Sequence, residues 1–191
     1  KLKITIHINM MLLSSTSDEE RLVAEQGPPT GKDYRRRLEN AGGYSEVWEI
    51  VKETVEYVFQ KHRTGIMLFL DDLPIQLGAY HPLGTNNIVL NRVLVQIVEV
   101  ADSPKRVINA LIYNLLVHEY LHALGEVSEI RVRELVVEVA KKCFGNDHIV
   151  TQAAMRSPWA LLKGIPLEAV NVPKHVMEIV KDFEKSDSYI V

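Results

Sequence analysis

The sequence predicts an α+β fold. In this fold a small mixed β-sheet with an exposed edge strand packs on a backing helix and a central helix, and a mostly helical C-terminal part follows. Three observations support this prediction. Apolar residues recur at helical spacing from Ser45 to His62, whereas residues 66–70 form a short continuous apolar run that is typical of a buried strand. The segment Val107 to Val117 contains no charged residue, which predicts a helix through the middle of the domain.

The chain has 191 residues, of which 47% are hydrophobic, and this size suits one domain with one core. We expect a single domain over residues 1–191, with the sheet in 1–103 and the central and later helices in 104–191. The formal net charge of -3 offers no basic stripe, so we expect no nucleic-acid partner. No run of about 18 apolar residues predicts a membrane span. The single cysteine, Cys143, excludes an internal disulfide and suggests a cytoplasmic location.

The N-terminal third contains a strand, a loop and the backing helix. Alternation of polar and apolar residues over Lys1 to Ile8 predicts a strand. Residues 14–33 are rich in Ser, Asp, Glu, Gly and Pro and predict a long loop. The basic stretch Arg35 to Arg37 indicates a solvated helix face. The amphipathic helix of residues 45–62 then covers the sheet.

The sheet continues between residues 66 and 100. Ile66 to Leu70 is bounded by Gly65 and by acidic residues, as expected of a buried strand. Glycine and proline separate two further β-type segments, Leu77 to Tyr80 and Ile88 to Leu90, whose polar flanks indicate an exposed edge. Residues 93–100 are apolar, and their pattern fits either an extension of that strand or the start of a helix.

The second half of the chain predicts helices. Ser103-Pro104 supplies an N-cap followed by proline at the first position of the central helix. Gly125 is suited to end that helix in a left-handed conformation, and Ser128 can cap a helix over Glu129 to Lys142. The remainder predicts short helices broken at glycine and proline.

The segment HEYLH at 118–122 carries the most informative chemistry. His118 and His122 are four residues apart, so on a helix their rings project from one face and can hold one Zn²⁺. Glu119 lies beside the first ligand, where its carboxylate can take a proton from a metal-bound water that attacks a carbonyl. These ionisable residues follow a long uncharged stretch, where unpaired polar groups are costly. We therefore expect a zinc site with Glu119 as the catalytic base.

A catalytic zinc site needs a third protein ligand. Position 128, which holds a histidine in one subclass of HExxH peptidases, is Ser128 here. We favour Glu129, because a chain that reverses at Gly125 brings the first turn of the next helix back toward His122. A capping or helix-dipole role for Glu129 is the alternative. The acidic residues that follow the motif, and so form the candidate set, are Glu126, Glu129, Glu134 and Glu138.

Three segments together resemble the zincin metallopeptidases, and among them the gluzincins of the small archaeal minigluzincin type. They are HEYLHALG at 118–125, SEIRVREL at 128–135 and GAYHPLGTNNIVLN at 78–91. The resemblance implies a sheet above the active-site helix, with an edge strand that binds extended substrate. Tyr80 or His81 could stabilise an oxyanion there, and a turn-forming or packing role is the alternative for either residue. The substrate-binding residues that the resemblance implies are Asn87, Ile88, Val89 and Leu90.

The expected function is zinc-dependent hydrolysis of peptide bonds in a peptide or protein substrate. One alternative is metal-dependent RNA hydrolysis, because endoribonucleases also use an H-x3-H helix, although Glu119 argues for peptidase chemistry. A second alternative is a latent or non-catalytic zincin scaffold that binds peptides. In a latent protein the C-terminal segment Ser188 to Val191 could occupy a substrate groove.

Overall fold

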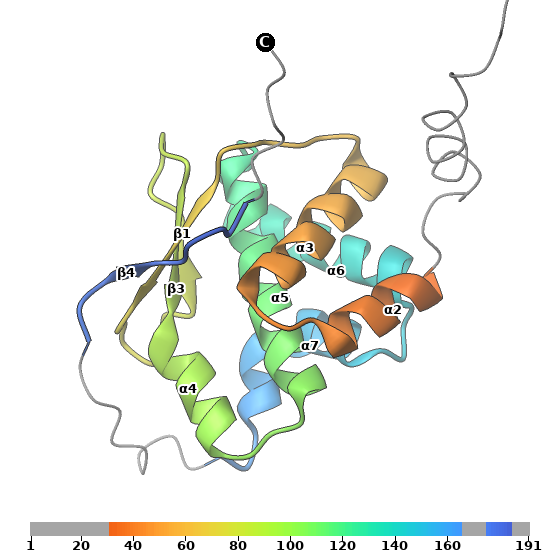
Figure 1. Cartoon of the computed structure of the whole chain (residues 1–191). Helices are drawn as coiled ribbons and strands as arrows, with labels where there is room; N and C mark the ends of the chain where they lie inside the picture. Colours follow the sequence, from red (N-terminus) through yellow and green to blue (C-terminus); the bar gives the residue numbers. More distant parts are fainter. Residues whose placement is uncertain (1–30, 166–174, 185–191) are drawn as a thin grey trace, which may run out of the picture.

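The computed structural model describes residues 31–165 and 175–184, and these residues form the predicted α+β architecture (Figure 1). A four-stranded sheet lies on one side of the molecule and a group of helices on the other, with α5 in the centre. The strand expected at residues 1–8 and residues 14–30 of the expected loop lie outside the described residues. The last three residues of that expected loop, 31–33, instead begin a helix. In chain order the elements are α2 (Gly31–Asn40), α3 (Tyr44–Phe59), β1 (Met67–Asp71), β2 (Ala79–Tyr80), β3 (Asn87–Asn91), α4 (Arg92–Val100), α5 (Lys105–Ala123), α6 (Glu129–Phe144), α7 (Ile149–Arg156), η1 (Pro158–Leu162) and β4 (Glu178–Ile179).

The sheet is mixed and has the strand order β2-β3-β1-β4. β1 and β3 are parallel, β2 is antiparallel to β3, and β4 is antiparallel to β1. The expectation that residues 87–91 form the exposed edge is therefore wrong, because β3 is an inner strand. The cause is the preceding turn: the carbonyl of Gly78 accepts a hydrogen bond from the N–H of Asn91 (2.8 Å) and aligns β2 along β3. Within the part of the chain that the structure describes, the short strands β2 and β4 form the edges.

Residues 92–100, whose pattern left strand and helix open, form the helix α4 directly after β3. Asn91 explains this change. Its Oδ1 accepts from the N–H of Val93 (3.0 Å), which caps the helix. Its Nδ2 donates to three carbonyls of the preceding turn, Leu73, Pro74 and Leu77. One buried side chain therefore ends a strand, starts a helix and fixes the turn that carries β2.

The central helix α5 is buried as its lack of charge predicts, and every residue from Asn109 to Val117 is buried. It packs against the sheet through β2 and β3 and against α2, α3, α4, α6 and α7. It begins at Lys105 with Pro104 at the N-cap position, so the expected cap by Ser103 is wrong. The N–H of Ser103 instead bonds the carbonyl of Val98 and completes the turn after α4. Among the described residues, no helix combines the length and apolar composition of a membrane span.

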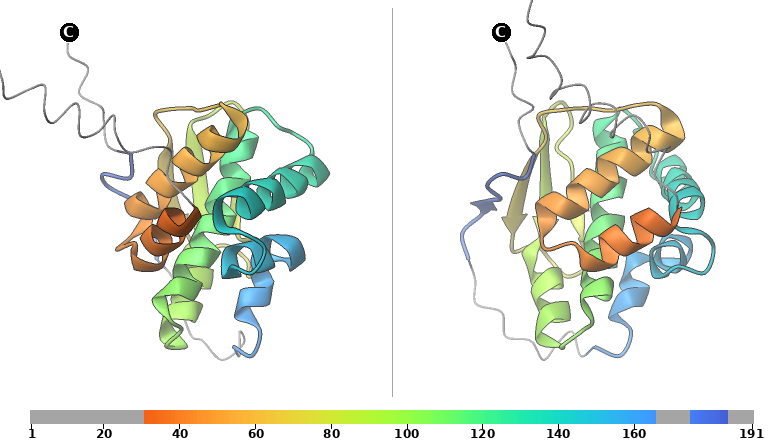
Figure 2. Two further views of the ribbon diagram at one scale, coloured as in Figure 1. Left: turned by 90° about the vertical axis from the view of Figure 1, so that its right-hand side faces the viewer. Right: turned by 45° about the vertical axis from the view of Figure 1, so that its right-hand side comes forward.

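α3 is the predicted amphipathic helix, with Val47, Trp48, Val51 and Val55 buried. The expectation that it covers the sheet is wrong, because its main packing partner is the central helix α5. α3 crosses in front of α5, and α2 lies next to it (Figure 2). α2 and α3 thus form the outer layer of helices over the central one.

The solvated face expected at Arg35 to Arg37 is only partly correct. Arg36 is exposed, but Arg35 pairs with Asp147 (2.8 Å) and Arg37 pairs with Glu53 (2.6 Å). These partners lie after α6 and on α3, so two of the three arginines connect α2 to neighbouring elements.

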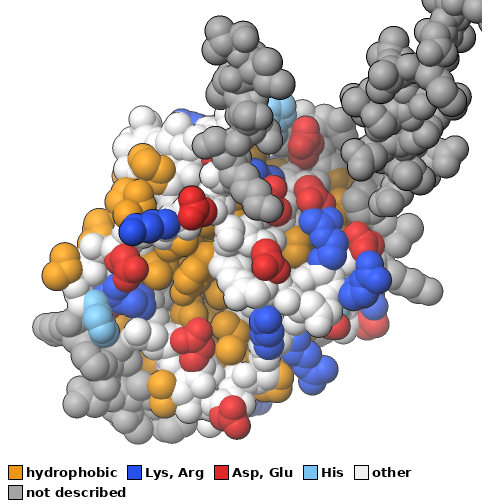
Figure 3. Space-filling view, in the orientation of Figure 1, with side chains coloured by type: hydrophobic (Ala, Val, Ile, Leu, Met, Phe, Trp, Pro, Cys, Tyr) orange, Lys and Arg blue, Asp and Glu red, His pale blue; other side chains and the backbone are white. Residues whose placement is uncertain are grey.

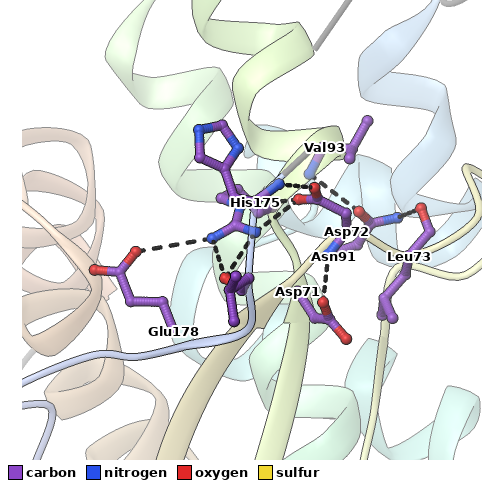
Figure 4. A network of polar contacts seen from close by, with 9 residues as sticks. Asp71, Asp72, Leu73, Asn91, Val93, His175 and Glu178 are labelled. Carbon is purple, nitrogen blue, oxygen red and sulfur yellow. Dashed lines mark hydrogen bonds and ion pairs between the residues drawn. The ribbon is translucent and has the colours of Figure 1, made fainter. Parts of the chain in front are cut away.

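The C-terminal part is not only helical, since residues 175–184, here called the C-terminal strap, return to the sheet as β4. The buried Arg92 donates to the carboxylate of Asp72 (2.9 and 2.8 Å) and to the carbonyl of Val176 (3.4 and 3.3 Å). The N–H of His175 donates to the same carboxylate (2.7 Å; Figure 4). Burial tends to raise the pKa of Asp72, but the bonds from His175 and Arg92 outweigh it and lower the pKa.

The end of the strap closes the core. Phe183 is 3% exposed and its ring stacks on that of Trp48, with centroids 4.9 Å apart. Glu184 accepts from the N–H of Ile66 (2.7 Å) and pairs with Lys52 (3.3 Å). In the space-filling view, apolar side chains gather on the side where the sheet and the strap lie, whereas charged side chains of both signs cover α2 (Figure 3).

Candidate metal centre

The turn after α5 positions the site. Gly125 adopts φ +101° and forms a Schellman motif, in which its N–H bonds the carbonyl of His122 (2.9 Å) and the N–H of Glu126 bonds that of Leu121 (3.2 Å). The hydroxyl of Ser128 then accepts from the N–H of Arg131 and caps α6. The sequence therefore correctly predicts both the helix end and the cap, and the reversal returns the start of α6 to α5.

His118, His122 and Glu129 meet at this reversal. The two imidazole rings have centroids 5.0 Å apart. The Nε2 atoms of His118 and His122 lie 3.3 and 3.1 Å from the two carboxylate oxygens of Glu129. One ligand atom from each residue lies within 4.8 Å of the other two. The three predicted ligand residues are therefore brought together on adjacent helices.

This arrangement fits a metal ion. Two imidazole nitrogens and a carboxylate oxygen are a ligand set of catalytic zinc sites, in which bond lengths near 2.0–2.1 Å separate neighbouring ligand atoms by roughly 3.4 Å. The Nδ1 of His122 lies 2.6 Å from the carbonyl oxygen of Glu126, to which it donates. Metal-binding histidines commonly donate their second nitrogen in this way. Nε2 of His122 is then the nitrogen that can bind an ion.

The other acidic candidates are engaged elsewhere. The carboxylate of Glu126 accepts from a main-chain N–H, and the two later glutamates lie in ion pairs on the exposed surface of α6. The contacts are Glu126 with the N–H of Ser128 (3.0 Å), Glu134 with Arg131 (2.9 Å) and Glu138 with Lys142 (2.8 Å). Glu129, with a side chain that is 62% exposed, is the one that turns toward the imidazoles.

Glu119 lies beside this cluster and is only 7% exposed. Burial raises the pKa of its carboxyl group to about 8, and the negative charge of Glu129 adds to the rise. The main-chain N–H of His81 acts in the opposite direction by hydrogen bonding to the charged form. The pKa of His118 is lowered, first by burial, although the Glu129 carboxylate opposes this.

A cavity of about 320 Å³ adjoins His118, Glu119 and Glu129. Residues 76–79, which lead into and begin β2, line it together with residues of α5, α6, α7 and η1. Sequence reasoning missed Arg133, Arg156 and Trp159, which also line the cavity. Arg133 follows Glu129 by one helical turn and could have been found from that spacing, whereas the other two carry no local signal.

The residues expected to bind substrate lie differently. Asn87 to Leu90 do not line the cavity, and Ile88, Val89 and Leu90 are buried inside the sheet. Tyr80 and His81 also lie outside its lining. The Nδ1 of His81 is 2.9 Å from the carbonyl oxygen of Asn87, which places that ring against β3. The segment that borders the cavity is Gln76 to Ala79 instead.

Comparisons of the chain with protein-family models, with curated proteins and with solved structures found no match.

Proposed function

We propose that the protein is a zinc-dependent peptidase, in which His118, His122 and Glu129 bind the ion and Glu119 is the general base. The observation that carries the proposal is the convergence of three ligand atoms within 4.8 Å next to a buried carboxyl group. The resemblance of the HEYLH segment to the zincin metallopeptidases, in particular the gluzincins, agrees with it. A cytoplasmic location is part of the proposal, because Cys143 is a free buried thiol.

The chain's own residues have distinct tasks. A zinc ion supplies Lewis-acid polarisation of a peptide carbonyl and lowers the pKa of water. Glu119 accepts the proton of the attacking water and delivers it to the leaving amine. Glu119 would be favoured in its ionised form by a cation bound at these ligands, which would offset the effect of burial on its pKa. Glu126 acts through its carbonyl oxygen, which holds the ring of His122 in place.

Among the residues that the structure describes, no strand pairs with the outer edge of β2, which makes this edge the better candidate for binding the substrate main chain. Gly78 and Asn91 form a hydrogen-bonded pair in the antiparallel ladder of β2 and β3. Such pairs alternate, so the N–H and C=O of the next residue, Ala79, point away from β3. Ala79 lines the cavity and can offer these groups to an extended peptide. We therefore assign to β2 the role that the sequence had suggested for Asn87 to Leu90.

Substitution of Glu119 tests the proposal. We expect Glu119→Gln to retain one zinc ion per chain, measured by atomic emission, and to cleave a quenched-fluorescence peptide library at least about 1,000-fold more slowly. Glu129→Ala should lose zinc. Glu134→Gln, also on α6 but paired with Arg131, is the matched control and should retain both zinc and cleavage.

Full peptide cleavage by Glu119→Gln would overturn the assigned mechanism. Zinc binding without cleavage of any peptide would favour the non-catalytic scaffold instead. Hydrolysis of RNA by the same preparation, abolished by Glu119→Gln, would favour the nuclease alternative.

A further inference from the structure

Two arginines, Arg133 and Arg156, line the cavity beside His118 and Glu119. Arg133 lies on α6, and Arg156 is the last residue of α7. Within residues 31–165 and 175–184, no ion pair involves either guanidinium group. Arg131, two residues before Arg133, does pair with an acidic neighbour. Both arginines are exposed to solvent, so the cavity lining offers two accessible positive charges that lack an ion-pair partner in this part of the chain.

The remaining walls of the cavity combine apolar residues with the polar side chains of Gln76, Asn114 and Ser157. The apolar residues include Leu115, Val136, Ala154 and Trp159. The indole Nε1 of Trp159 donates to the carbonyl of Ile75 (3.2 Å), which fixes the ring against the segment before β2. A peptide segment that combines apolar and polar groups and carries a negatively charged end fits this lining. Guanidinium groups bind carboxylates with two parallel hydrogen bonds, which makes a carboxylate the best-matched anion of a peptide.

We propose that this cavity binds a carboxylate of the substrate through Arg133 and Arg156, beside the candidate metal centre. The inference rests on the proposed function, since it names the class of peptide that the site accepts. Glu129 forms no ion pair with either arginine, because its carboxylate is turned toward the two imidazoles. A lysine or arginine side chain that entered the cavity would meet two like charges, so basic residues are disfavoured there.

Two parts of a peptide carry a carboxylate, namely an acidic side chain and the free C-terminus. If the side chain is recognised, the enzyme cleaves next to an acidic residue within a chain. If the C-terminus is recognised, it removes short pieces from the ends of peptides. The ligand chemistry is the same in both cases, so the experiment must separate them.

Binding to zinc-loaded Glu119→Gln protein separates the two sources without cleavage of the probe. The probes are hexaalanine peptides in which a single Glu, or a single Gln, replaces one of the four central alanines in turn. Each peptide is made with a free and with an amidated C-terminus. Calorimetry measures affinity, and the emission of Trp159 reports on the cavity, because the second tryptophan, Trp48, is buried in the core.

We expect one carboxylate to improve affinity about tenfold or more, because a charge-assisted bidentate pair is worth at least that factor. A preference for Glu over Gln in amidated peptides identifies the side chain, and a preference for the free acid over the amide identifies the C-terminus. Arg133→Gln or Arg156→Gln should remove the preference. Arg131→Gln, which deletes the same charge from the same helix outside the cavity, should leave it unchanged.

Equal affinity of all four kinds of peptide, or a preference that survives both Arg133→Gln and Arg156→Gln, would overturn the inference. These outcomes are independent of catalysis. If wild-type protein cleaves peptides without any such preference, the inference alone fails. If the preference is present and no peptide is cleaved, the peptidase proposal fails and carboxylate binding stands.

Discussion

The Nδ1 atom of His122 lies 2.6 Å from the main-chain oxygen of Glu126, so the turn that ends α5 also orients a candidate metal ligand. A carbonyl oxygen can only accept, and Nδ1 therefore carries the proton of this hydrogen bond. The φ of +101° at Gly125 makes the turn, and the turn places the carbonyl. The end of α5 and the orientation of the candidate ligand thus depend on the same three residues, His122, Gly125 and Glu126.

This geometry predicts the tautomer of His122 in the zinc-loaded protein. We expect the proton on Nδ1 and none on Nε2, because Nε2 faces Glu129 and is the atom available to an ion. Long-range ¹H–¹⁵N NMR spectra of the imidazole identify the tautomer, and spectra recorded with a chelator serve as the control. A proton found on Nε2 in the presence of zinc would contradict the proposed ligand set.

The pKa of Glu119 predicts a pH-dependent stability of the metal-free protein. Since its folded-state pKa is raised from 4.5 to about 8, the unfolded chain releases this proton first, and the free energy of unfolding falls as pH rises from about 4.5 to about 8. Above that range both states are ionised and the effect is constant. Glu119→Gln removes the charge and should stabilise the metal-free protein at pH 8 by roughly 2 to 4 kcal/mol.

Urea unfolding between pH 4 and 9 in the presence of a chelator measures this difference. Glu134→Gln is the control, because its carboxylate is exposed and paired with Arg131. Curves for wild type and Glu119→Gln that stay parallel over the whole range would refute the assignment of this titration to Glu119.

Zinc should stabilise the folded state, because the three ligands converge only when α5 and α6 are packed. At a free zinc concentration of 100 times the dissociation constant, the gain is about 2.7 kcal/mol, or roughly 5 to 10 °C in melting temperature for a chain of this size. Calorimetric melting of wild type and Glu119→Gln should show this shift, and that of Glu129→Ala should not. An equal shift in Glu129→Ala would place the ion elsewhere.

Local signals explain which parts of the fold and site the sequence predicted. The apolar spacing of α3, the uncharged run of α5 and the caps at Gly125 and Ser128 all lie within a few residues of the feature that they determine. The choice of Glu129 belongs to this group, since it follows His122 by seven residues across one short turn. Short-range patterns therefore pointed to the three residues that converge in the candidate metal centre.

The sequence-based predictions were wrong or incomplete where the structure depends on contacts between segments that are far apart in the chain. A strand's place in the sheet depends on its partners, and the partner that covers β3 is the two-residue strand β2, which is too short for a clear pattern. β4 pairs with β1 from more than 100 residues away. Arg156 and Trp159 reach the cavity because α7 packs on α6 and α5, a contact that no local motif encodes.

Gly78 is predicted to be sensitive to any side chain. A Cβ atom there would lie 2.5 Å from Leu115 Cδ2 and 2.9 Å from the ring of Trp159. Gly78→Ala should therefore displace the indole, lower the free energy of unfolding by about 1 to 3 kcal/mol and shift the tryptophan emission. Gly43→Ala is the matched control, because a Cβ at Gly43 meets nothing within 4 Å and its φ of -179° suits any residue. Equal stability of the two variants would show that Leu115 and Trp159 move to accommodate the added Cβ without a cost in stability.

The contacts of the C-terminal strap lead us to expect different stabilities for two truncated chains. A chain that ends at Asp182 loses the stacking of Phe183 on Trp48 and both contacts of Glu184, so its free energy of unfolding should fall by about 3 to 5 kcal/mol. A chain that ends at Glu184 retains these contacts and should unfold at the same urea concentration as the full chain. Equal stability of both truncations would contradict the role of the strap in the core.

The same pair of chains decides whether the protein is latent. A truncation at Asp182 would confuse release of the substrate groove with loss of the core, so only the chain ending at Glu184 is informative. If this chain cleaves peptides faster than the full chain at equal stability, residues 185–191 restrain the active site. If the rates are equal, the latent alternative loses its support, because the strap itself is held by Arg92, Asp72 and Phe183 on the far side of the sheet from β2.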